Sequence, residues 1–508
     1  LAASAGVPVV MLDIPGDPDR NGIARAGLQR ALKAKPAPFM DGSRAALVTT
    51  GNTDDHLHLL AECDWIVEAI VEQVEPKRAL YARLESVRRA GTIVSSNTSG
   101  IPMRLLTEGR SVDFTRHFLG THFFNPPRYL HLLELIPTEE TASAVVTTIR
   151  HFAERILGKG VVLAKDVPGF IANRLGIFGM VQTLRLMEEF DLSIDEVDAL
   201  TGPLIGRAKS ATFRTGDISG IDVLAHVAAG TSATTGEDFT LPGWVGALVS
   251  SGRLGDKTGG GFYRKEKDGI LTLDWKTLDY RPQQKPRFPE LAFVEKVPLH
   301  QRLRAFGTAG GKHAEFVRTL LLTVGHYTID KTPELAHDIV SVDRAMEWGY
   351  AWEMGPYRQM DALGLDFVRA GLAQRGLAEP MLLRKAQESF YRDLSSGPRH
   401  LTFVGDYAPI EGIPGHIDLP LVALRSGTLE RNEGAALLDL GDGVLLLEFR
   451  GKMNTLGAPV LQLLESAERT IASGGYAGLV IGNDDPRTFS AGADLAPVVQ
   501  GVQDGAWT

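Results

Sequence analysis

Short apolar runs rich in β-branched residues alternate with segments of helical periodicity over residues 1–165. The runs cover residues 7–13, 65–70 and 92–96, and each is typical of a strand buried on both faces. Between the second and third runs, Pro76 begins a segment in which Leu80, Leu84 and Val87 share one helical face. A further helical pattern extends from near residue 138 to Gly158. Strands that alternate with helices predict a doubly wound α/β sheet.

From residue 166 onward the strand signal fades, and helical patterns predict a mostly α-helical domain over 166–270. An internal repeat indicates a second such domain. The two copies are Val197-Asp198 followed by Asp217-Ile-Ser-Gly-Ile-Asp222, and Val342-Asp343 followed by Asp361-Ala-Leu-Gly-Leu-Asp366. The spacing from the first to the last Asp is 24 positions in one copy and 23 in the other. We therefore predict a second helical domain over 315–400, and a proline-bearing linker over 271–314.

The α/β pattern returns in the last part of the chain. A second linker is predicted over 401–432, and apolar runs follow at 443–449 and 478–482. Residues 433–508 supply two strands and one helix, which are too few to close a sheet. Residues 1–6, for their part, are typical of the last turn of a helix followed by a glycine C-cap. We expect the chain to be truncated at both ends.

Composition narrows the function classes. Of 508 residues, 44% are hydrophobic, and 53 Lys and Arg against 62 Asp and Glu give a net charge of −9, which argues against a nucleic-acid partner. The single cysteine, Cys63, excludes an internal disulfide framework and a thiolate metal cluster. No apolar run approaches the roughly 20 residues of a membrane span, and no secretory signal pattern is present. We expect a cytoplasmic protein that binds no metal.

Polar residues follow two of the predicted strands. Asp13 ends the first run, where an acidic residue of a dinucleotide-binding sheet accepts hydrogen bonds from a ribose, although strand-terminal Asp residues are more often plain caps. Residues 95–100, Ser-Ser-Asn-Thr-Ser-Gly, follow the third run and include Ser99. The carboxyl edge of such a sheet is where α/β enzymes place ligand-binding loops, but an N-cap loop before a helix is also consistent with this pattern.

His122 and Glu134 are the strongest candidates for chemistry. His122 lies at a strand end before an Asn-Pro-Pro turn, and the apolar sequence Leu132-Leu-Glu-Leu-Ile136 returns after it. Because a buried unpaired carboxylate is costly, Glu134 requires a partner. His131 competes for this role, but it would lie on the opposite side of an extended strand. We predict that Glu134 lies beside His122, an arrangement that would make the imidazole a general base.

A third candidate begins the first helical domain. The sequence Asp166-Val-Pro-Gly-Phe-Ile-Ala-Asn-Arg174 places Asn173 about two turns into a predicted helix, at the seam between domains. Interdomain seams are common substrate sites, and a structural hydrogen bond is the alternative. The second helical copy has no identifiable counterpart of Asn173, so we expect it to serve as a packing platform.

Taken together, Ser-Asn-Thr-Ser, His-Phe-Phe-Asn-Pro, the Glu twelve residues after that His, and Asp-Val-Pro-Gly-Phe-Ile-Ala-Asn-Arg resemble the 3-hydroxyacyl-CoA dehydrogenase family in order and spacing. Phe489-Ser-Ala-Gly-Ala-Asp-Leu495 is similar to the crotonase (enoyl-CoA hydratase) motif. The order of the parts resembles a bacterial bifunctional protein of fatty-acid β-oxidation. The resemblance implies a Rossmann domain without its first strand, two dehydrogenase C-terminal helical domains, and the start of a crotonase-like α/β domain.

The resemblance also implies roles for single residues and for partners. His122 would be the base that removes the 3-hydroxyl proton, Glu134 would orient it, and Ser99 and Asn173 would bind the reacting oxygen or the thioester. NAD would contact Asp13, Glu72, Lys77 and Asn125, and the backbone N–H of Ala493 would hold a thioester oxyanion in the crotonase part. Acyl-CoA thioesters would be the substrates, and a thiolase subunit would be a partner.

Two departures from the family and two alternatives follow. The glycine turn Gly-x-Gly-x-x-Gly is absent from the sequence, which removes the backbone cradle of a pyrophosphate. The crotonase part ends before the family's catalytic glutamates, so we expect no hydration by this chain.

One alternative is another Rossmann dehydrogenase with a lysine base, acting on a free 3-hydroxy acid or a sugar acid. The other is a non-catalytic scaffold that binds acyl-CoA.

Overall fold

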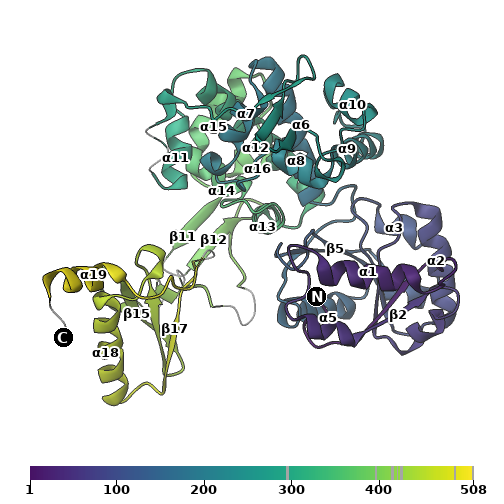
Figure 1. The fold of residues 1–508 in the computed structure, drawn as a ribbon, viewed down its shortest axis with the longest axis horizontal. Helices are drawn as coiled ribbons and strands as arrows, with labels where there is room; N and C mark the ends of the chain where they lie inside the picture. Colours follow the sequence, from purple (N-terminus) through teal and green to yellow (C-terminus); the bar gives the residue numbers. More distant parts are fainter. Residues whose placement is uncertain are drawn as a thin grey trace. The chain divides into compact units, whose positions relative to one another are not determined.

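The structure is a computed structural model of the 508-residue chain. It describes all residues except 293, 295–296, 395–396, 413–416, 420–421, 424–426, 486–487 and 506–508. The chain divides into two compact units, one formed by residues 1–390 and 401–406 and the other by residues 391–400 and 407–508 (Figure 1).

The N-terminal part of the first unit contains two sheets. Strand β1 (Val9–Asp13) pairs in parallel with β2 (Val48–Asn52). A five-stranded sheet has the order β3-β4-β5-β6-β7, in which only β5 and β6 are antiparallel. Its strands are β3 (Trp65–Glu68), β4 (Ile93–Ser96), β5 (Phe118–Phe123), β6 (Leu132–Pro137) and β7 (Gly160–Leu163). The predicted single sheet is therefore divided, because no strand among the described residues pairs with both β1 and β3.

Helices cover these sheets, and their apolar faces form the core. They are α1 (Gly22–Lys33), α2 (Val74–Val87), α3 (Met103–Leu106), α4 (Val112–Arg116) and α5 (Ser143–Arg155). Val145 and Ile149 of α5 pack against Leu133 and Leu135 of β6, which explains the helical periodicity of that segment. Helix α5 begins five residues later than predicted, because β6 runs through Pro137 and residues 138–141 form a turn that the Thr141 hydroxyl closes.

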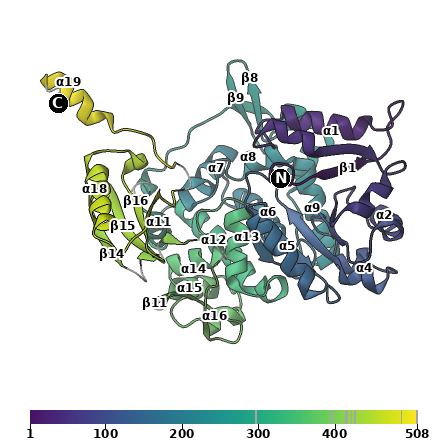
Figure 2. The same cartoon turned by 90° about the horizontal axis from the view of Figure 1, so that it is seen from below.

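The remainder of the first unit is dominated by helices. The first copy of the repeat contains α6 (Ala172–Glu189), α7 (Ile194–Thr201), α8 (Phe213–Ser219), α9 (Ile221–Thr235) and α10 (Gly243–Ser250), followed by the sheet of β8 (Tyr263–Glu266), β9 (Gly269–Leu273) and β10 (Tyr280–Pro282). The second copy contains α12 (Lys312–Leu335), α13 (Ile339–Gly349), α14 (Pro356–Leu363), α15 (Leu365–Gln374) and α16 (Met381–Lys385). Helix α12 packs against α6 (Figure 2).

Both copies use the repeated aspartates in the same way. The Asp198 carboxylate accepts the backbone N–H groups of Phe213 and Arg214 at the start of α8, and Asp343 accepts those of Tyr357 and Arg358 at the start of α14. This contact caps a helix N-terminus that would otherwise leave its N–H groups unpaired.

The glycine of each copy also has an equivalent backbone conformation. Gly220 and Gly364 both adopt a positive φ, of 100° and 92°, in the tight turn between two helices. The repeat that the sequence indicates is thus a repeat of structure.

Two predicted linkers contain regular structure. Residues 271–314 include β10 and the helix α11 (Leu299–Phe306), because Leu299, Leu303 and Phe306 form an apolar face that is buried. The second helical domain ends near Phe390, ten residues before its predicted boundary, and β11 (Tyr391–Leu394) already belongs to the second unit. Strands β12 (Gly397–Leu401) and β13 (Tyr407–Pro409) complete the sheet that β11 begins, and β13 lies within the second predicted linker, 401–432.

The rest of the second unit is an α/β arrangement. Its four strands have the order β14-β15-β16-β17, with bounds Thr428–Arg431, Ala435–Gly441, Val444–Phe449 and Gly478–Gly482. Helix α18 (Ala458–Ala472) packs Val460 and Leu463 against this sheet, and α19 (Leu495–Asp504) follows. Strands β14 and β15 are additional to the two that the sequence indicated; the side chains of β14 are exposed, whereas Ala435–Leu438 of β15 are buried.

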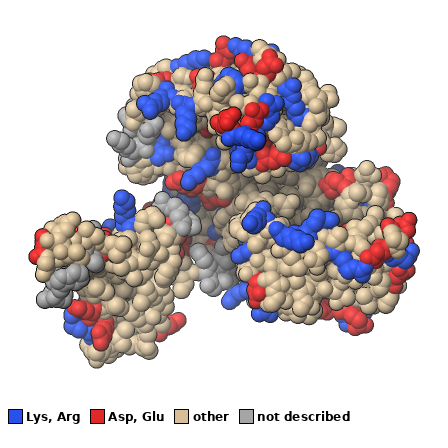
Figure 3. All heavy atoms as spheres, in the orientation of Figure 1, with Lys and Arg blue, Asp and Glu red and all other residues tan. Residues whose placement is uncertain are grey.

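The surface carries both signs of charge. On the face that Figure 3 shows, Lys and Arg atoms are interspersed with those of Asp and Glu, in agreement with the near balance of the composition. Among the helices of the described residues, none combines the length and apolar character that a membrane crossing requires.

Candidate active site

His122 and Glu134 form a buried pair in the middle of the five-stranded sheet. They are directly opposite each other in the antiparallel register of β5 and β6, as the returning apolar strand predicts. His122 Nδ1 lies 2.7 Å from Glu134 Oε2, and the two residues are 4% and 0% exposed. Removal from water strengthens this charge-assisted contact and fixes the ring orientation. The competing His131 instead packs edge-on against Trp348, with ring centroids 5.0 Å apart.

The second oxygen of Glu134 is held by the start of helix α6. Oε1 accepts the backbone N–H groups of Ile171 and Ala172, at 3.1 and 2.9 Å. A helix N-terminus favours negative charge because its first N–H groups have no partner within the helix. Glu134 therefore stays where it can stabilise a positive charge on His122, and it connects β6 to the helical part of the unit.

Asn173 and Ser99 are also brought together. Asn173 Nδ2 donates to the backbone oxygen of Ser99 at 3.2 Å. Asn173 is the second residue of α6, which corrects the prediction of two helical turns before it. The helix starts late because Gly169 and Phe170 have positive φ angles of 76° and 49°, a conformation that interrupts a right-handed helix.

The Ser99 loop is fixed to the sheet by carboxylates and amides. The Ser99 backbone N–H donates to Glu72 Oε1 at 2.8 Å, and the Thr98 hydroxyl contacts the same oxygen. Asn97 Oδ1 accepts the backbone N–H of Phe123, the residue after His122, at 2.9 Å. Four predicted residues, His122, Glu134, Ser99 and Asn173, are thus gathered by direct contacts or through neighbouring backbone.

Glu68 is a residue that the sequence analysis missed. It ends β3, is 3% exposed, and accepts hydrogen bonds from Lys77 Nζ at 2.7 Å and from the Tyr81 and Ser96 hydroxyls at 2.6 Å each. Lys77 also lies 3.5 Å from Glu72. The signal was available, since Glu68 is a single carboxylate within the apolar run 65–70, as Glu134 is within its own.

The remaining predicted cofactor residues are Asp13 and Asn125. Asp13 ends β1 with an exposed carboxylate that accepts the backbone N–H of Ile14 at 2.8 Å. An exposed acceptor at a strand end fits a ribose, so this part of the chain suits the adenosine side of NAD. No Gly-x-Gly-x-x-Gly turn is present in the sequence to receive the pyrophosphate.

Asn125 is exposed in a loop that a buried lysine holds. The Lys159 Nζ donates to the backbone oxygen of Pro127 at 2.7 Å and also to that of Leu130. Lys159 has no carboxylate partner among the described residues, and its burial lowers the pKa of its ammonium group to about 8. Two backbone contacts thus anchor the loop that follows His122.

In the second unit, Ala493 lies in a bridge with Leu456. The Leu456 N–H donates to Gly492 O at 2.9 Å, and the Asp494 N–H donates to Leu456 O at 3.0 Å. This pattern turns the N–H of Ala493 away from Leu456, and the residue is exposed.

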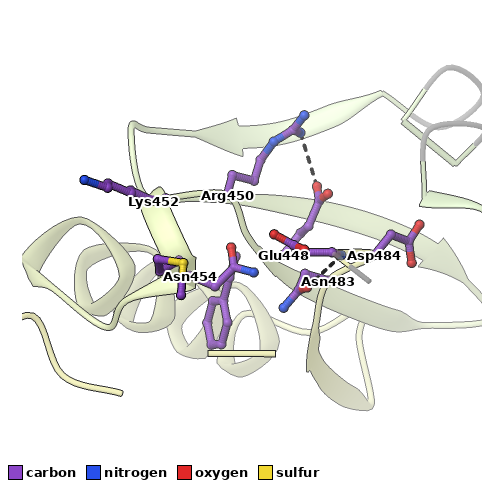
Figure 4. A pocket seen from close by; sticks show the side chains of 10 residues that line it. Glu448, Arg450, Lys452, Asn454, Asn483 and Asp484 are labelled. Atoms are coloured by element: carbon purple, nitrogen blue, oxygen red, sulfur yellow. Dashed lines mark hydrogen bonds and ion pairs between the residues drawn. The ribbon is translucent and has the colours of Figure 1, made fainter. Parts of the chain in front are cut away.

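Near this bridge lies a cavity of about 510 Å³, lined by residues that include Glu448, Arg450, Lys452, Asn454 and Asn483 (Figure 4). The buried Asn454 ties its loop to the motif that contains Ala493, since its Nδ2 donates to Thr488 O and its backbone oxygen accepts the Ser490 hydroxyl.

Comparison with known proteins assigns two regions of the chain to family models. The model of the 3-hydroxyacyl-CoA dehydrogenase NAD binding domain matches residues 1–167, and that of the 3-hydroxyacyl-CoA dehydrogenase C-terminal domain matches residues 169–265. A probable 3-hydroxyacyl-CoA dehydrogenase of Bacillus subtilis (strain 168) is 39% identical over an alignment of 531 positions that covers 99% of this chain and 66% of that protein. This chain thus spans slightly less than two thirds of that relative.

A second relative is shorter and more similar. A probable 3-hydroxyacyl-CoA dehydrogenase of Deinococcus radiodurans is 55% identical over 270 residues, which are 52% of this chain and 78% of that protein. The solved 3-hydroxybutyryl-CoA dehydrogenase of Escherichia coli K12 shares the fold, with a TM-score of 0.57 at 21% identity over 76% of this chain and 94% of that chain. The chain belongs to the 3-hydroxyacyl-CoA dehydrogenase family of oxidoreductases and contains its NAD-binding domain.

Proposed function

We propose that this protein oxidises (S)-3-hydroxyacyl-CoA to 3-ketoacyl-CoA with NAD, in fatty-acid β-oxidation. The observation that carries the proposal is the buried contact of 2.7 Å between His122 Nδ1 and Glu134 Oε2. An imidazole held in this way presents Nε2 as a base of fixed orientation, which the removal of a hydroxyl proton requires. NAD supplies the acceptor for the hydride that leaves C3.

The surrounding residues would orient the substrate. Asn173 uses one hydrogen of its amide on Ser99 O, which leaves the other hydrogen for the reacting oxygen or the thioester. The Ser99 hydroxyl lies in the same exposed loop, and Glu72 holds that loop by its backbone. Positioning of this kind lowers the barrier because the reacting atoms are already aligned.

For NAD, we propose Asp13 on the adenosine ribose and Glu72, Lys77 and Asn125 along the rest of the dinucleotide. The support is that Glu72 and Lys77 adjoin the Ser99 loop, while Asp13 carries an exposed carboxylate at a strand end. The carboxylate would repel a 2′-phosphate, which favours NAD over NADP.

For the whole protein, we propose an additional enoyl-CoA hydratase activity. The support is the motif around Ala493, whose N–H would contribute to an oxyanion site beside the cavity of the second unit. Acyl-CoA thioesters would serve both parts, a thiolase subunit would consume the product, and the cytoplasm remains the predicted location.

The test follows NADH absorbance with acetoacetyl-CoA for the wild type and for His122→Gln. Loss of a general acid-base group lowers kcat by about 10²- to 10⁴-fold. The matched control is His151→Gln, which changes an exposed histidine of α5 and leaves the rate unaltered.

Two results would contradict the proposal. An unaltered rate in His122→Gln would favour a Rossmann dehydrogenase with a lysine base. A wild type that binds both acetoacetyl-CoA and NADH but oxidises no NADH would favour an acyl-CoA scaffold.

A further inference from the structure

The second helical copy reaches the candidate active site with the end of α13. The residues concerned are Trp348, Gly349 and the following Tyr350, and they contact both β6–β7 and α6. The Tyr350 ring lies edge-on to Phe124, with centroids 6.3 Å apart, and the Phe124 ring in turn lies tilted against the His122 ring, with centroids 4.5 Å apart. This copy was expected to be a packing platform only.

Glycines on both sides make this close approach possible. A Cβ added at Gly176 of α6 would overlap the Tyr350 ring, and one added at Gly160 of β7 would overlap Trp348. At Gly349 the added atom would lie 2.7 Å from Leu132 of β6. Three glycines on three elements thus allow the turn at 348–350 to sit against the catalytic sheet and helix α6, and this restricts where the phenol can lie.

The Tyr350 hydroxyl meets the amide of Asn173. Its oxygen lies 3.4 Å from Asn173 Oδ1, while Asn173 Nδ2 lies 3.2 Å from Ser99 O. The two contacts agree on one orientation of the amide, because a flipped amide would place its oxygen against the carbonyl of Ser99 and its NH₂ group against the phenol. The contact is long for a hydroxyl donor, and such contacts shorten when substrate closes a site.

The Tyr350 phenol keeps its proton, so its interaction with Asn173 is a hydrogen bond that the phenol donates to the amide oxygen. Burial, and secondarily the nearby Glu134 carboxylate, raise the pKa of Tyr350 well above its usual value. A protonated, half-buried hydroxyl favours an acceptor, and Asn173 Oδ1 is in place to be one.

We propose that Tyr350, from the second helical copy, is a positioning residue of the dehydrogenase site that fixes the Asn173 amide with one N–H directed at the substrate oxygen. This inference rests on the proposed function, since it assigns Asn173 to the substrate. It makes the second copy part of the active site, where it supplies one hydroxyl that the first copy lacks.

The experiment is a double-mutant cycle on the full chain with Tyr350→Phe, Asn173→Ala and both together. The steady-state parameters are measured with acetoacetyl-CoA and NADH, and the affinity for acetoacetyl-CoA is measured by calorimetry without NADH. The matched control is Tyr357→Phe, which removes another buried hydroxyl of the same helical copy, at the start of α14. Thermal unfolding shows whether each variant is folded.

We expect Tyr350→Phe to lower kcat about fivefold, the effect of one lost hydrogen bond, with the KM for NADH unchanged. Because the phenol acts through Asn173, the double variant should match Asn173→Ala within about twofold. Tyr357→Phe should match the wild type. A Tyr350→Phe enzyme with wild-type kcat, or effects of the two substitutions that multiply, would overturn the inference.

The calorimetric cycle separates this inference from the proposed function. If the wild type binds acetoacetyl-CoA but does not turn over, the dehydrogenase proposal fails. The affinities of the same four proteins for acetoacetyl-CoA then still decide the role of Tyr350. The inference is supported if Tyr350→Phe lowers the affinity of the wild type but not that of Asn173→Ala. It is overturned if Tyr350→Phe and the wild type bind acetoacetyl-CoA equally.

Discussion

Two buried glutamates of one sheet, Glu68 in β3 and Glu134 in β6, differ in the donors that hold them. Glu68 receives a permanent cation, Lys77, two hydroxyl groups and the backbone N–H of Ile70. Glu134 receives two backbone N–H groups and the His122 ring, so it faces a full positive charge only when that ring is protonated. The comparison teaches that a fixed countercharge makes a buried carboxylate structural. A partner that can be neutral or protonated instead allows the carboxylate to stabilise the protonated form of that partner.

The largest effect is expected for Glu134→Gln. The Gln oxygen can still accept from Ile171 and Ala172, but its NH₂ group would donate to His122 Nδ1 and hold the ring in the tautomer that cannot serve as a base. A comparable change of tautomer in a protease triad lowers kcat by about 10⁴-fold, so a loss of at least about 10²-fold is expected here. Stopped-flow reduction of acetoacetyl-CoA measures it, and circular dichroism verifies the fold. A kcat within tenfold of the wild type would show that Glu134 only supports structure.

Glu68→Gln should act on stability instead. The substitution leaves the buried Lys77 without its partner at 2.7 Å, and the loss of one member of a buried ion pair costs about 3 kcal/mol. Urea unfolding measures the change, and kcat of the folded variant should stay within about threefold of the wild type. Glu85→Gln, a change in a half-buried ion pair of α2, provides the comparison for a pair closer to solvent. If Glu68→Gln left stability unchanged and lowered kcat as much as Glu134→Gln, the distinction between the two glutamates would be lost.

The two glutamates also show what could be predicted from sequence. A carboxylate alone in an apolar strand demands a partner, and that rule placed Glu134 beside His122 because the returning strand limits the choices. The same rule applies to Glu68, but its partners lie on α2 and β4, and their convergence depends on the packing of a helix on the sheet.

The repeated aspartates could be recognised in the sequence because a carboxylate that caps a helix must lie at a fixed spacing from that helix. The repeat also includes Phe262-Tyr263-Arg264 and Phe390-Tyr391-Arg392, where Asp217 and Asp361 accept the Phe262 and Phe390 N–H groups.

Other features depend on tertiary contacts that no local pattern encodes. The contact of Tyr350 with Asn173 joins residues 177 positions apart, and only the docking of α13 on the sheet creates it. The late start of α6 follows from the left-handed backbone at Phe170, a residue type that rarely adopts it. Helix α11 was taken for a linker because four prolines precede it, although its Leu299, Leu303 and Phe306 already had helical spacing.

Two buried lysines extend the comparison to cations and give the smallest expected effect. Lys77 has carboxylate partners, whereas Lys159 has two backbone carbonyls, and burial lowers the pKa of Lys159 to about 8. The unfolded chain holds this proton with an ordinary pKa near 10.5, so between pH 8 and 10.5 the unfolded state binds more protons and stability rises with pH. Below pH 8 the cost of the buried ammonium is fully present.

The wild type should therefore gain about 1 kcal/mol of stability from pH 7 to pH 9 relative to Lys159→Met, which keeps the aliphatic stem and removes the charge. Urea unfolding of both proteins at the two pH values measures this difference, and the subtraction removes the titrating groups that do not interact with Lys159; the Leu1 ammonium, whose pKa Lys159 lowers, is not among them. Parallel pH dependences would mean that the ammonium is as well compensated by the carbonyls of Pro127 and Leu130 as Lys77 is by carboxylates. Hydrogen bonding alone would then account for the stability of both buried lysines, because the presence of a carboxylate near Lys77 would make no measurable difference between them.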